Sequence, residues 1–265
     1  MNSKAPTFAC PSAGASPASL GSERNLTARR HAAPSTCMEP ARSSLVIFVD
    51  WDDTLFPTSE LLAQTYLVDS SHPQRSQLPA KVAQQVREVE DSVLKFLRSC
   101  QTRGTVVIVT NAMRGWVSRL TQWCMPRVGI HLRSGGIRVV YARECAASDP
   151  DDVSTWKQQS FLLETEAARA RLSKPRPLNV VSVGDATFER DAAHAAAGDW
   201  DAVTTVKFLE EPSLVELRQE LLTLTENIDS VTGGMRSGDA AGGGLGGDFD
   251  MTTKTKPSDC SRPRR

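Results

Sequence analysis

The stretch LVIFVDWDDTLFPT, residues 45–58, decides the fold of this chain. It begins with a continuous apolar run (45–49) and passes directly into acids at Asp50, Asp52 and Asp53. A short apolar run of this kind is typical of a strand that is buried on both faces of a parallel sheet. Ligands of open α/β sheets bind outside the carboxyl ends of the strands, so these acids lie where a functional site is expected.

Strand-like and helix-like segments alternate through the region that follows. Apolar runs rich in β-branched residues predict the strands, and apolar residues at helical spacing predict the helices between them. This alternation predicts an α/β fold with a mainly parallel sheet and helices on both faces. The predicted strands are 45–50, 105–110, 136–144, 178–185 and 202–210, and the predicted helices are 59–68, 80–104, 114–126 (stopped by Pro126), 155–172, 188–197 and 212–228.

The two ends of the chain differ from this central region in composition. Residues 1–43 are rich in Ser, Ala and Pro without a hydrophobic period, and residues 229–265 contain a Gly-rich stretch. Both ends are predicted to be disordered, which leaves 44–228 as one folded domain. The leader is also poor in acids, a composition that fits an organelle transit peptide as well as a plain disordered segment.

The composition restricts the partners and the compartment. The 265 residues carry a formal net charge of zero, so neither nucleic acid nor an acidic membrane is expected as a partner. The six cysteines form no CxxC pair, which favours reduced thiols in an intracellular protein. The sequence has no apolar run of about 18 residues, so we expect a soluble protein of the cytoplasm, or of an organelle if the leader is a transit peptide.

Two acids follow the first predicted strand at a spacing that suits phosphoryl chemistry. Asp50 can attack phosphorus and form an aspartyl-phosphate. Asp52 can protonate the leaving oxygen and later deprotonate the hydrolytic water. The same pattern also occurs in plain acidic loops, and Asp53 is interpreted as a loop residue.

Two polar residues elsewhere could serve the same chemistry. Thr110 ends the strand 105–110 and can donate its hydroxyl to a phosphoryl oxygen, although Thr at such a place is also a common local cap. Lys157 near the start of helix 155–172 can neutralise a phosphoryl group. Lys174 is a rival, but it lies among Ser and Pro at a helix end, so Lys157 is preferred.

The fourth predicted strand also ends in an acid. Asp185 follows Gly184, whose small size is expected to permit a tight turn. Glu189 lies one helical turn further on, and Asp191 remains a less favoured alternative as the second acid. Magnesium takes oxygen ligands and needs only one or two carboxylates beside water and phosphate. Acids also occur at helix N-termini without any metal.

Taken in order, these elements resemble the motifs of the haloacid dehalogenase-like superfamily. The resemblance covers about residues 44–210, and the stretches VTNAMRGWV and WKQQSF look like a eukaryotic branch with little or no cap domain. The matching residues are Asp50, Asp52 and Thr54 for the nucleophile motif, Thr110 for the second motif, Lys157 for the third, and Gly184, Asp185 and Glu189 for the acidic motif.

The resemblance implies a fold, a set of roles and a cofactor. The fold is a Rossmann-like sheet with strand order 5-4-1-2-3 and a minimal cap. Asp50 is implied as the nucleophile and Asp52 as the acid/base, with Thr110 and Lys157 holding the phosphoryl group. The implied cofactor is Mg²⁺, with a ligand set of Asp50, Asp52 (through its backbone carbonyl), Asp185 and Glu189, where Glu189 replaces the second Asp of the usual motif.

The implied function is a phosphatase that acts on a phosphomonoester. The substrate, a small molecule or a phosphoprotein, is not identified by the sequence. Two alternatives stay open: a catalytically silent binding or regulatory module with the same fold, and a phosphotransferase that passes the phosphoryl group to an alcohol.

Overall fold

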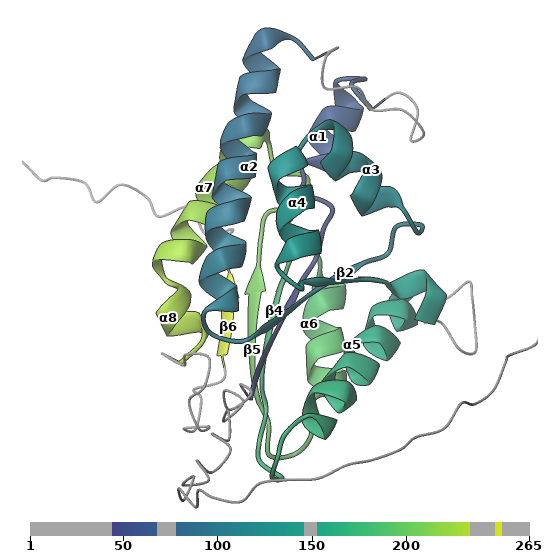
Figure 1. Ribbon diagram of the computed structural model, residues 1–265, viewed down its shortest axis with the longest axis vertical. Coiled ribbons are helices and arrows are strands. Elements are labelled where there is room, and N and C mark those ends of the chain that lie inside the picture. The colour runs from purple at the N-terminus through teal and green to yellow at the C-terminus, as the bar shows by residue number, and fades with distance from the viewer. Residues whose placement is uncertain (1–43, 68–77, 146–152, 234–246, 251–265) are drawn as a thin grey trace, which may run out of the picture. The chain divides into compact units, whose positions relative to one another are not determined.

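The computed structural model (Figure 1) describes four stretches of the chain, residues 44–67, 78–145, 153–233 and 247–250. The predicted disorder of residues 1–43 lies outside these stretches. Within them, no helix combines the length and the apolar character that crossing a membrane requires.

Six parallel strands form one sheet in the order β3-β2-β1-β4-β5-β6. The predicted order 5-4-1-2-3 is therefore confirmed for the first five strands, and β6 extends the sheet beyond β5. The strands are β1 (Leu45–Val49), β2 (Thr105–Thr110), β3 (Arg138–Tyr141), β4 (Asn179–Gly184), β5 (Ala202–Lys207) and β6 (Gly247–Asp250).

The central strand is β1, the strand predicted from the opening apolar run. All five of its residues are buried, because helices cover both faces of the sheet. Val49, its last residue, lies opposite Ile108 of β2 and Val183 of β4. The ends of these three neighbouring strands therefore meet at one edge of the sheet.

Helices cover the sheet in two layers with separate apolar cores (Figure 1). On one face, α2 packs along α7, and α4 contacts α2. On the other face, α5 and α6 lie side by side and bury Val46 and Phe48 of β1. The helices are α1 (Thr58–Ala63), α2 (Ala80–Gln101), α3 (Trp116–Trp123), α4 (Pro126–Ser134), the 3₁₀ turn η2 (Ala142–Cys145), α5 (Val153–Ala170), α6 (Thr187–Ala196), α7 (Leu214–Glu226) and α8 (Ile228–Val231).

The structure corrects the sequence prediction around Pro126. This proline does not stop a helix but begins α4, a helix that the pattern did not predict. Proline is well suited to the first helical position, because its missing N–H would have no partner there. The preceding helix α3 already ends at Trp123.

The predicted disordered tail is also wrong in part. Residues 228–231 form α8, and residues 247–250 form the edge strand β6, although the sequence predicted disorder from residue 229 onward. The four residues of β6 carry no periodic apolar signal, and their pairing with β5 depends on a tertiary contact. The rest of the predicted tail beyond residue 233 lies outside the described residues.

Candidate active site

A sharp turn follows β1 and separates the first two acids of the motif. The amides of Leu55 and Phe56 both donate to the Trp51 carbonyl at 2.9 Å, and the Asp53 amide donates to the Phe56 carbonyl at 2.7 Å. Asp53 has a φ of 54°, in the left-handed region that Asp adopts more readily than most residues. The turn carries Asp52 beyond the end of the strand.

Asp50 is the first acid after β1 and forms a buried ion pair. Its backbone amide still donates to the Val183 carbonyl at 2.9 Å, which continues the sheet by one step. Its Oδ1 lies 2.8 Å from Nζ of Lys157, a lysine of α5. Lys157 also pairs with Glu189 of α6, and all three side chains are buried. Residues from β1, α5 and α6 thus meet in one charged cluster.

Asp52 belongs to a second group of contacts. Its Oδ1 accepts hydrogen bonds from Thr58 Oγ1 at 2.6 Å and from Trp116 Nε1 at 2.8 Å. Its Oδ2 accepts a hydrogen bond from Thr110 Oγ1 at 3.1 Å. Donors from α1, α3 and β2 therefore hold this carboxylate in one orientation, and Asp52 itself remains partly exposed.

Asp185 lies past the end of β4, the strand next to β1. Thr54 Oγ1, from the turn after β1, lies 3.5 Å from its Oδ1. Lys207, the last residue of β5, donates a hydrogen bond to the Asp185 backbone carbonyl at 2.8 Å. The strand ends therefore bring Asp185 to the edge of the sheet that carries Asp50.

The electrostatics of this edge reflect several acids around one lysine. Burial raises the pKa of Asp50 well above its ordinary value, although the positive charge of Lys157 lowers it. The neighbouring acids Glu189, Asp52 and Asp185 raise it further. Burial and the charge of Glu189 raise the pKa of Asp185 to about 6. Burial would lower the pKa of Lys157, but Asp50 and Glu189 outweigh it and raise that pKa. The site therefore holds an excess of negative charge that a cation would relieve.

Gly184 has a different role from the one that the sequence suggested. It is the last residue of β4 and does not have a positive φ. A Cβ at this position would collide with the side chain of Glu189, which passes directly over the glycine. The small residue is therefore needed for Glu189 to reach Lys157.

Glu189 is not placed as the metal ligand that the resemblance implied. Its Oε1 pairs with Lys157, and its Oε2 accepts a hydrogen bond from the Ala186 amide at 3.2 Å. Asp191, the alternative acid, lies on the exposed surface beside Arg190. Glu189 and Asp191 therefore both have partners within the protein, and neither is directed at a metal site.

The four implied metal ligands do not gather around one point. Across the described stretches, no group of three or more His, Cys, Asp or Glu side chains is placed to hold a metal ion. The side chain of Asp52 is held by its three donors, which leaves its backbone carbonyl as the possible ligand, and Glu189 is held by Lys157. Two carboxylates, Asp50 and Asp185, remain, together with the backbone carbonyl of Asp52. This hard oxygen set fits Mg²⁺, which keeps several waters and binds through one or two carboxylates.

Several residues of the site were not predicted from the sequence. Trp116 carries no signal for this role in the sequence, yet its indole N–H donates to Asp52. Thr58 and Lys207 were not singled out, although each contacts one of the acids. A Thr or Lys side chain at an element boundary is too common to carry a signal of its own.

Comparisons of the chain with protein-family models, with curated proteins and with solved structures found no match. The chemistry of the residues gathered at this edge of the sheet is what indicates a function.

Proposed function

We propose that the protein is a Mg²⁺-dependent phosphohydrolase of the haloacid dehalogenase-like class that cleaves a phosphomonoester through Asp50. The observation that carries the proposal is the arrangement of two acids two residues apart. Asp50 is paired with a buried lysine, and Asp52 is held by three separate donors. This division gives two carboxylates different surroundings and so different tasks.

In the first step, a carboxylate oxygen of Asp50 attacks phosphorus and the bond to the ester oxygen breaks. The protonated carboxyl group of Asp52 gives its proton to the departing alkoxide, and an alcohol leaves. Lys157 neutralises the phosphoryl oxygens and is itself held by Glu189. The product of this step is an aspartyl-phosphate at Asp50.

In the second step, the carboxylate of Asp52 removes a proton from a water molecule, which attacks phosphorus. The bond between phosphorus and the Asp50 oxygen breaks, so inorganic phosphate leaves and Asp50 is regenerated. Asp52 is again protonated and ready for the next ester. Thr58, Thr110 and Trp116 keep its carboxylate in reach in both steps.

Asp50, Asp185 and the backbone carbonyl of Asp52 would hold the Mg²⁺ ion. When bound, the ion supplies positive charge that favours the ionised form of Asp50 and neutralises the phosphoryl oxygens. The raised pKa values of Asp50 and Asp185 support this assignment, because they arise from burial and from repulsion among neighbouring acids.

Hydrolysis of p-nitrophenyl phosphate with and without Mg²⁺ tests the proposal. We expect Asp50→Asn to lower kcat by more than about 10³-fold, the scale of loss when a nucleophile is removed. Asp191→Asn removes an equally short acid from the exposed part of α6 and should leave kcat unchanged. Equal turnover by the wild-type and Asp50→Asn proteins would exclude Asp50 as the nucleophile.

A phosphoryl mimic gives a second readout that needs no substrate. With Mg²⁺ and beryllium fluoride, ¹⁹F NMR of the wild-type protein should show a bound BeF₃⁻ signal, which Asp50→Asn abolishes. A wild-type protein that binds neither Mg²⁺ nor the mimic would favour the silent binding module instead. Transfer of phosphate to added alcohols in place of water would favour the phosphotransferase.

A further inference from the structure

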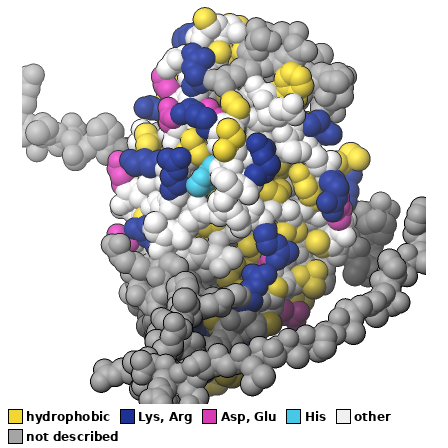
Figure 2. Space-filling view, in the orientation of Figure 1, with side chains coloured by type: hydrophobic (Ala, Val, Ile, Leu, Met, Phe, Trp, Pro, Cys, Tyr) yellow, Lys and Arg dark blue, Asp and Glu magenta, His cyan; other side chains and the backbone are white. Residues whose placement is uncertain are grey.

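A groove of about 510 Å³ runs between α2 and α4, on the face of the molecule that Figure 2 shows. Lys and Arg side chains gather on this face around a His side chain, with hydrophobic side chains among them (Figure 2). The groove is lined by Lys95 and Arg98 of α2 and by Arg127, Ile130 and His131 of α4. A hollow of this size suits a small molecule.

The positive charges at the two ends of the groove are balanced to different degrees. Arg127 donates to Asp91 Oδ1 at 2.6 Å and pairs with Glu90 at 2.9 Å, so acids compensate its charge. Lys95 and Arg98 lie one and two helical turns beyond Asp91 on α2, and both are exposed. Neither has an acidic partner within the described stretches of the chain. This end of the groove therefore carries uncompensated positive charge.

The hydrogen bonds of His131 define which of its ring nitrogens is free. The Gln101 side chain donates from Nε2 to the Gly135 carbonyl at 2.8 Å, so its Oε1 is the atom that faces His131. Nε2 of His131 lies 2.8 Å from this oxygen and must carry a hydrogen, because the oxygen can only accept. Nδ1 therefore gains the proton when the imidazole becomes charged, and no described residue forms a hydrogen bond with it.

Arg98 and His131 influence each other electrostatically. Burial lowers the pKa of His131 from its ordinary value, and the positive charge of Arg98 lowers it further. Lys95 is a neighbour of Arg98 on the helix surface, since the two are three residues apart on α2. An anion bound among these three groups would remove the repulsion between the two cations and the protonated imidazole.

The wall beside these charges is apolar. Ile130, next to His131 on α4, is 58% exposed, and Leu94 lines the groove from α2. A ligand that covers Ile130 gains hydrophobic stabilisation in addition to its charge interactions. The groove therefore combines a positive end with an apolar wall.

We propose that the groove between α2 and α4 binds a small phosphate-bearing ligand, with its phosphate among Lys95, Arg98 and His131 and an apolar body against Ile130. Arg and Lys are common partners of phosphate, and the planar guanidinium can donate two parallel hydrogen bonds to it. A doubly charged phosphate matches two cations and an imidazole that can take up a proton. An acidic peptide would need cations along the whole groove, whereas the uncompensated ones occur at one end.

This site differs from the candidate active site. Arg98 and His131 lie in the last turns of α2 and α4, which lead toward the amino ends of β2 and β3. Asp50 and Asp185 follow the carboxyl ends of β1 and β4. The ligand of the groove is therefore not the phosphoryl group that Asp50 would attack.

An NMR titration of the full-length chain with phenylphosphonate tests this inference. The probe carries an apolar ring, and a phosphomonoesterase does not cleave its carbon–phosphorus bond. EDTA removes the Mg²⁺ that the candidate active site would need. The imidazole signal of His131, assigned with His131→Gln, reports binding in the groove. We expect a dissociation constant on the order of 1 mM, and a rise of at least about 0.5 in the pKa of His131, because the anion offsets the charge of Arg98.

Matched substitutions on α2 test where the probe binds. Arg98→Gln should weaken binding at least about ten-fold, as expected when a hydrogen bond between charged groups is lost. Arg87→Gln removes another exposed arginine of the same helix, outside the groove, and should bind the probe as the wild type does. Equal dissociation constants for the wild-type and Arg98→Gln chains would overturn the proposal, as would an unchanged His131 signal in the wild type.

Two further probes test the class of ligand. Inorganic phosphate lacks the apolar body, so it should bind the wild type about three- to five-fold more weakly than phenylphosphonate, and Ile130→Ser should abolish this difference. Equal binding of both probes to the wild type would contradict the contact with Ile130. Tighter binding of the peptide acetyl-Glu-Glu-Leu-Glu-amide would overturn the small ligand in favour of a protein partner. All these readouts come from His131, so they do not depend on whether Asp50 is a nucleophile.

Discussion

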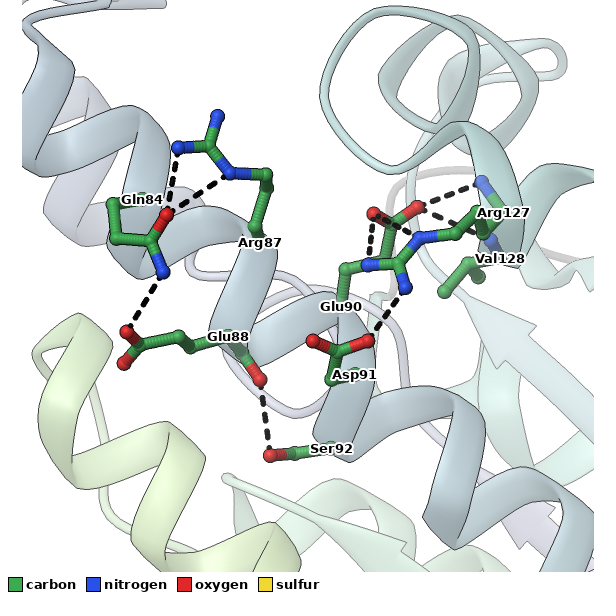
Figure 3. Close-up of polar contacts among 8 residues, drawn as sticks. All are labelled: Gln84, Arg87, Glu88, Glu90, Asp91, Ser92, Arg127 and Val128. Atoms are coloured by element: carbon green, nitrogen blue, oxygen red, sulfur yellow. Dashed lines mark hydrogen bonds and ion pairs between the residues drawn. The ribbon is translucent and has the colours of Figure 1, made fainter.

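Two buried carboxylates of this protein meet a basic residue in different ways. Glu90 of α2 is completely buried and accepts hydrogen bonds from Arg127 Nε at 3.1 Å and Nη2 at 2.9 Å (Figure 3). Its Oε1 also accepts hydrogen bonds from the backbone amides of Arg127 at 2.7 Å and Val128 at 3.4 Å, and Glu90 therefore caps the N-terminus of α4. By contrast, Oδ1 of Asp50 has only the ion pair with Lys157. No other donor among the described residues reaches this oxygen.

The surroundings of the two bases also differ. Arg127 is 49% exposed and lies where α2 and α4 form a surface on which Lys and Arg side chains are spread among hydrophobic ones (Figure 2). Lys157 is almost completely buried between two acids. A carboxylate saturated with donors stabilises the packing of two helices, whereas one with a single cation keeps an oxygen available for chemistry.

The largest effect should follow removal of the buried base. Lys157→Ala leaves Asp50 and Glu189 buried without their cation, and we expect a loss of about 3–5 kcal/mol in the free energy of unfolding together with loss of activity. Urea denaturation measures the first effect. Adding Asp50→Asn should recover part of the stability without recovering activity, because one uncompensated charge is gone. Additive losses in the double variant would contradict the direct pairing.

Loss of the contact between Glu90 and α4 should lower stability without affecting catalysis. Glu90→Ala removes the acceptor of two amides and a guanidinium, so we expect a loss of about 2–4 kcal/mol in the free energy of unfolding. Turnover per folded molecule should not change, because Glu90 lies outside the active site. Glu88→Ala is the matched control on the same helix. Its partner Arg218 is 3.7 Å away and both side chains are partly exposed, so its loss should stay below about 1 kcal/mol.

A smaller effect on catalysis is expected at Trp116. Trp116→Phe keeps the aromatic packing but removes the N–H that donates to Asp52. We expect kcat to fall about five- to ten-fold, the equivalent of one hydrogen bond of about 1–1.5 kcal/mol. Trp123→Phe is the control from the same helix and should leave kcat unchanged. Steady-state kinetics on p-nitrophenyl phosphate give kcat for both variants. Equal kcat values would show that the N–H of Trp116 does not contribute to catalysis.

Glu220 extends the comparison to a buried carboxylate with no basic partner at hydrogen-bond distance among the described residues. It accepts the Leu209 amide at 2.8 Å, while burial, followed by the nearby Glu216 and Asp185, raises its pKa from 4.5 to about 7. Between these values the folded chain holds a proton that the unfolded chain releases, so stability falls as the pH rises.

Replacing Glu220 by Gln should remove this pH-dependent penalty. Glu220→Gln keeps an acceptor for Leu209 and should raise Tm relative to the wild type above pH 7. The difference should disappear below about pH 4.5, where the glutamate is protonated in both states. Differential scanning calorimetry across this range measures it, and a constant difference would mean that Glu220 does not titrate as described.

The candidate site was predictable where it depends on the ends of strands. Asp50, Thr110 and Asp185 each follow a recognisable apolar run, and parallel strands bring such residues to one edge. Lys157 was chosen from its helix position and from the resemblance, and the structure pairs it with Asp50. The sequence did not predict the contacts of Trp116 with Asp52 or of Glu189 with Lys157, because the direction of a side chain depends on how its helix packs.

The sequence by itself determined the positions of β1 to β5 and of most helices, because hydrophobic periodicity is a local property that each segment carries alone. Only the tertiary structure decided that Glu189 reaches Lys157 over Gly184, that Glu90 caps α4, and that residues 247–250 join the sheet. These contacts link segments from 32 to more than 40 residues apart or depend on one missing Cβ. No local pattern records them, since they arise only when packed elements bring a donor and an acceptor together.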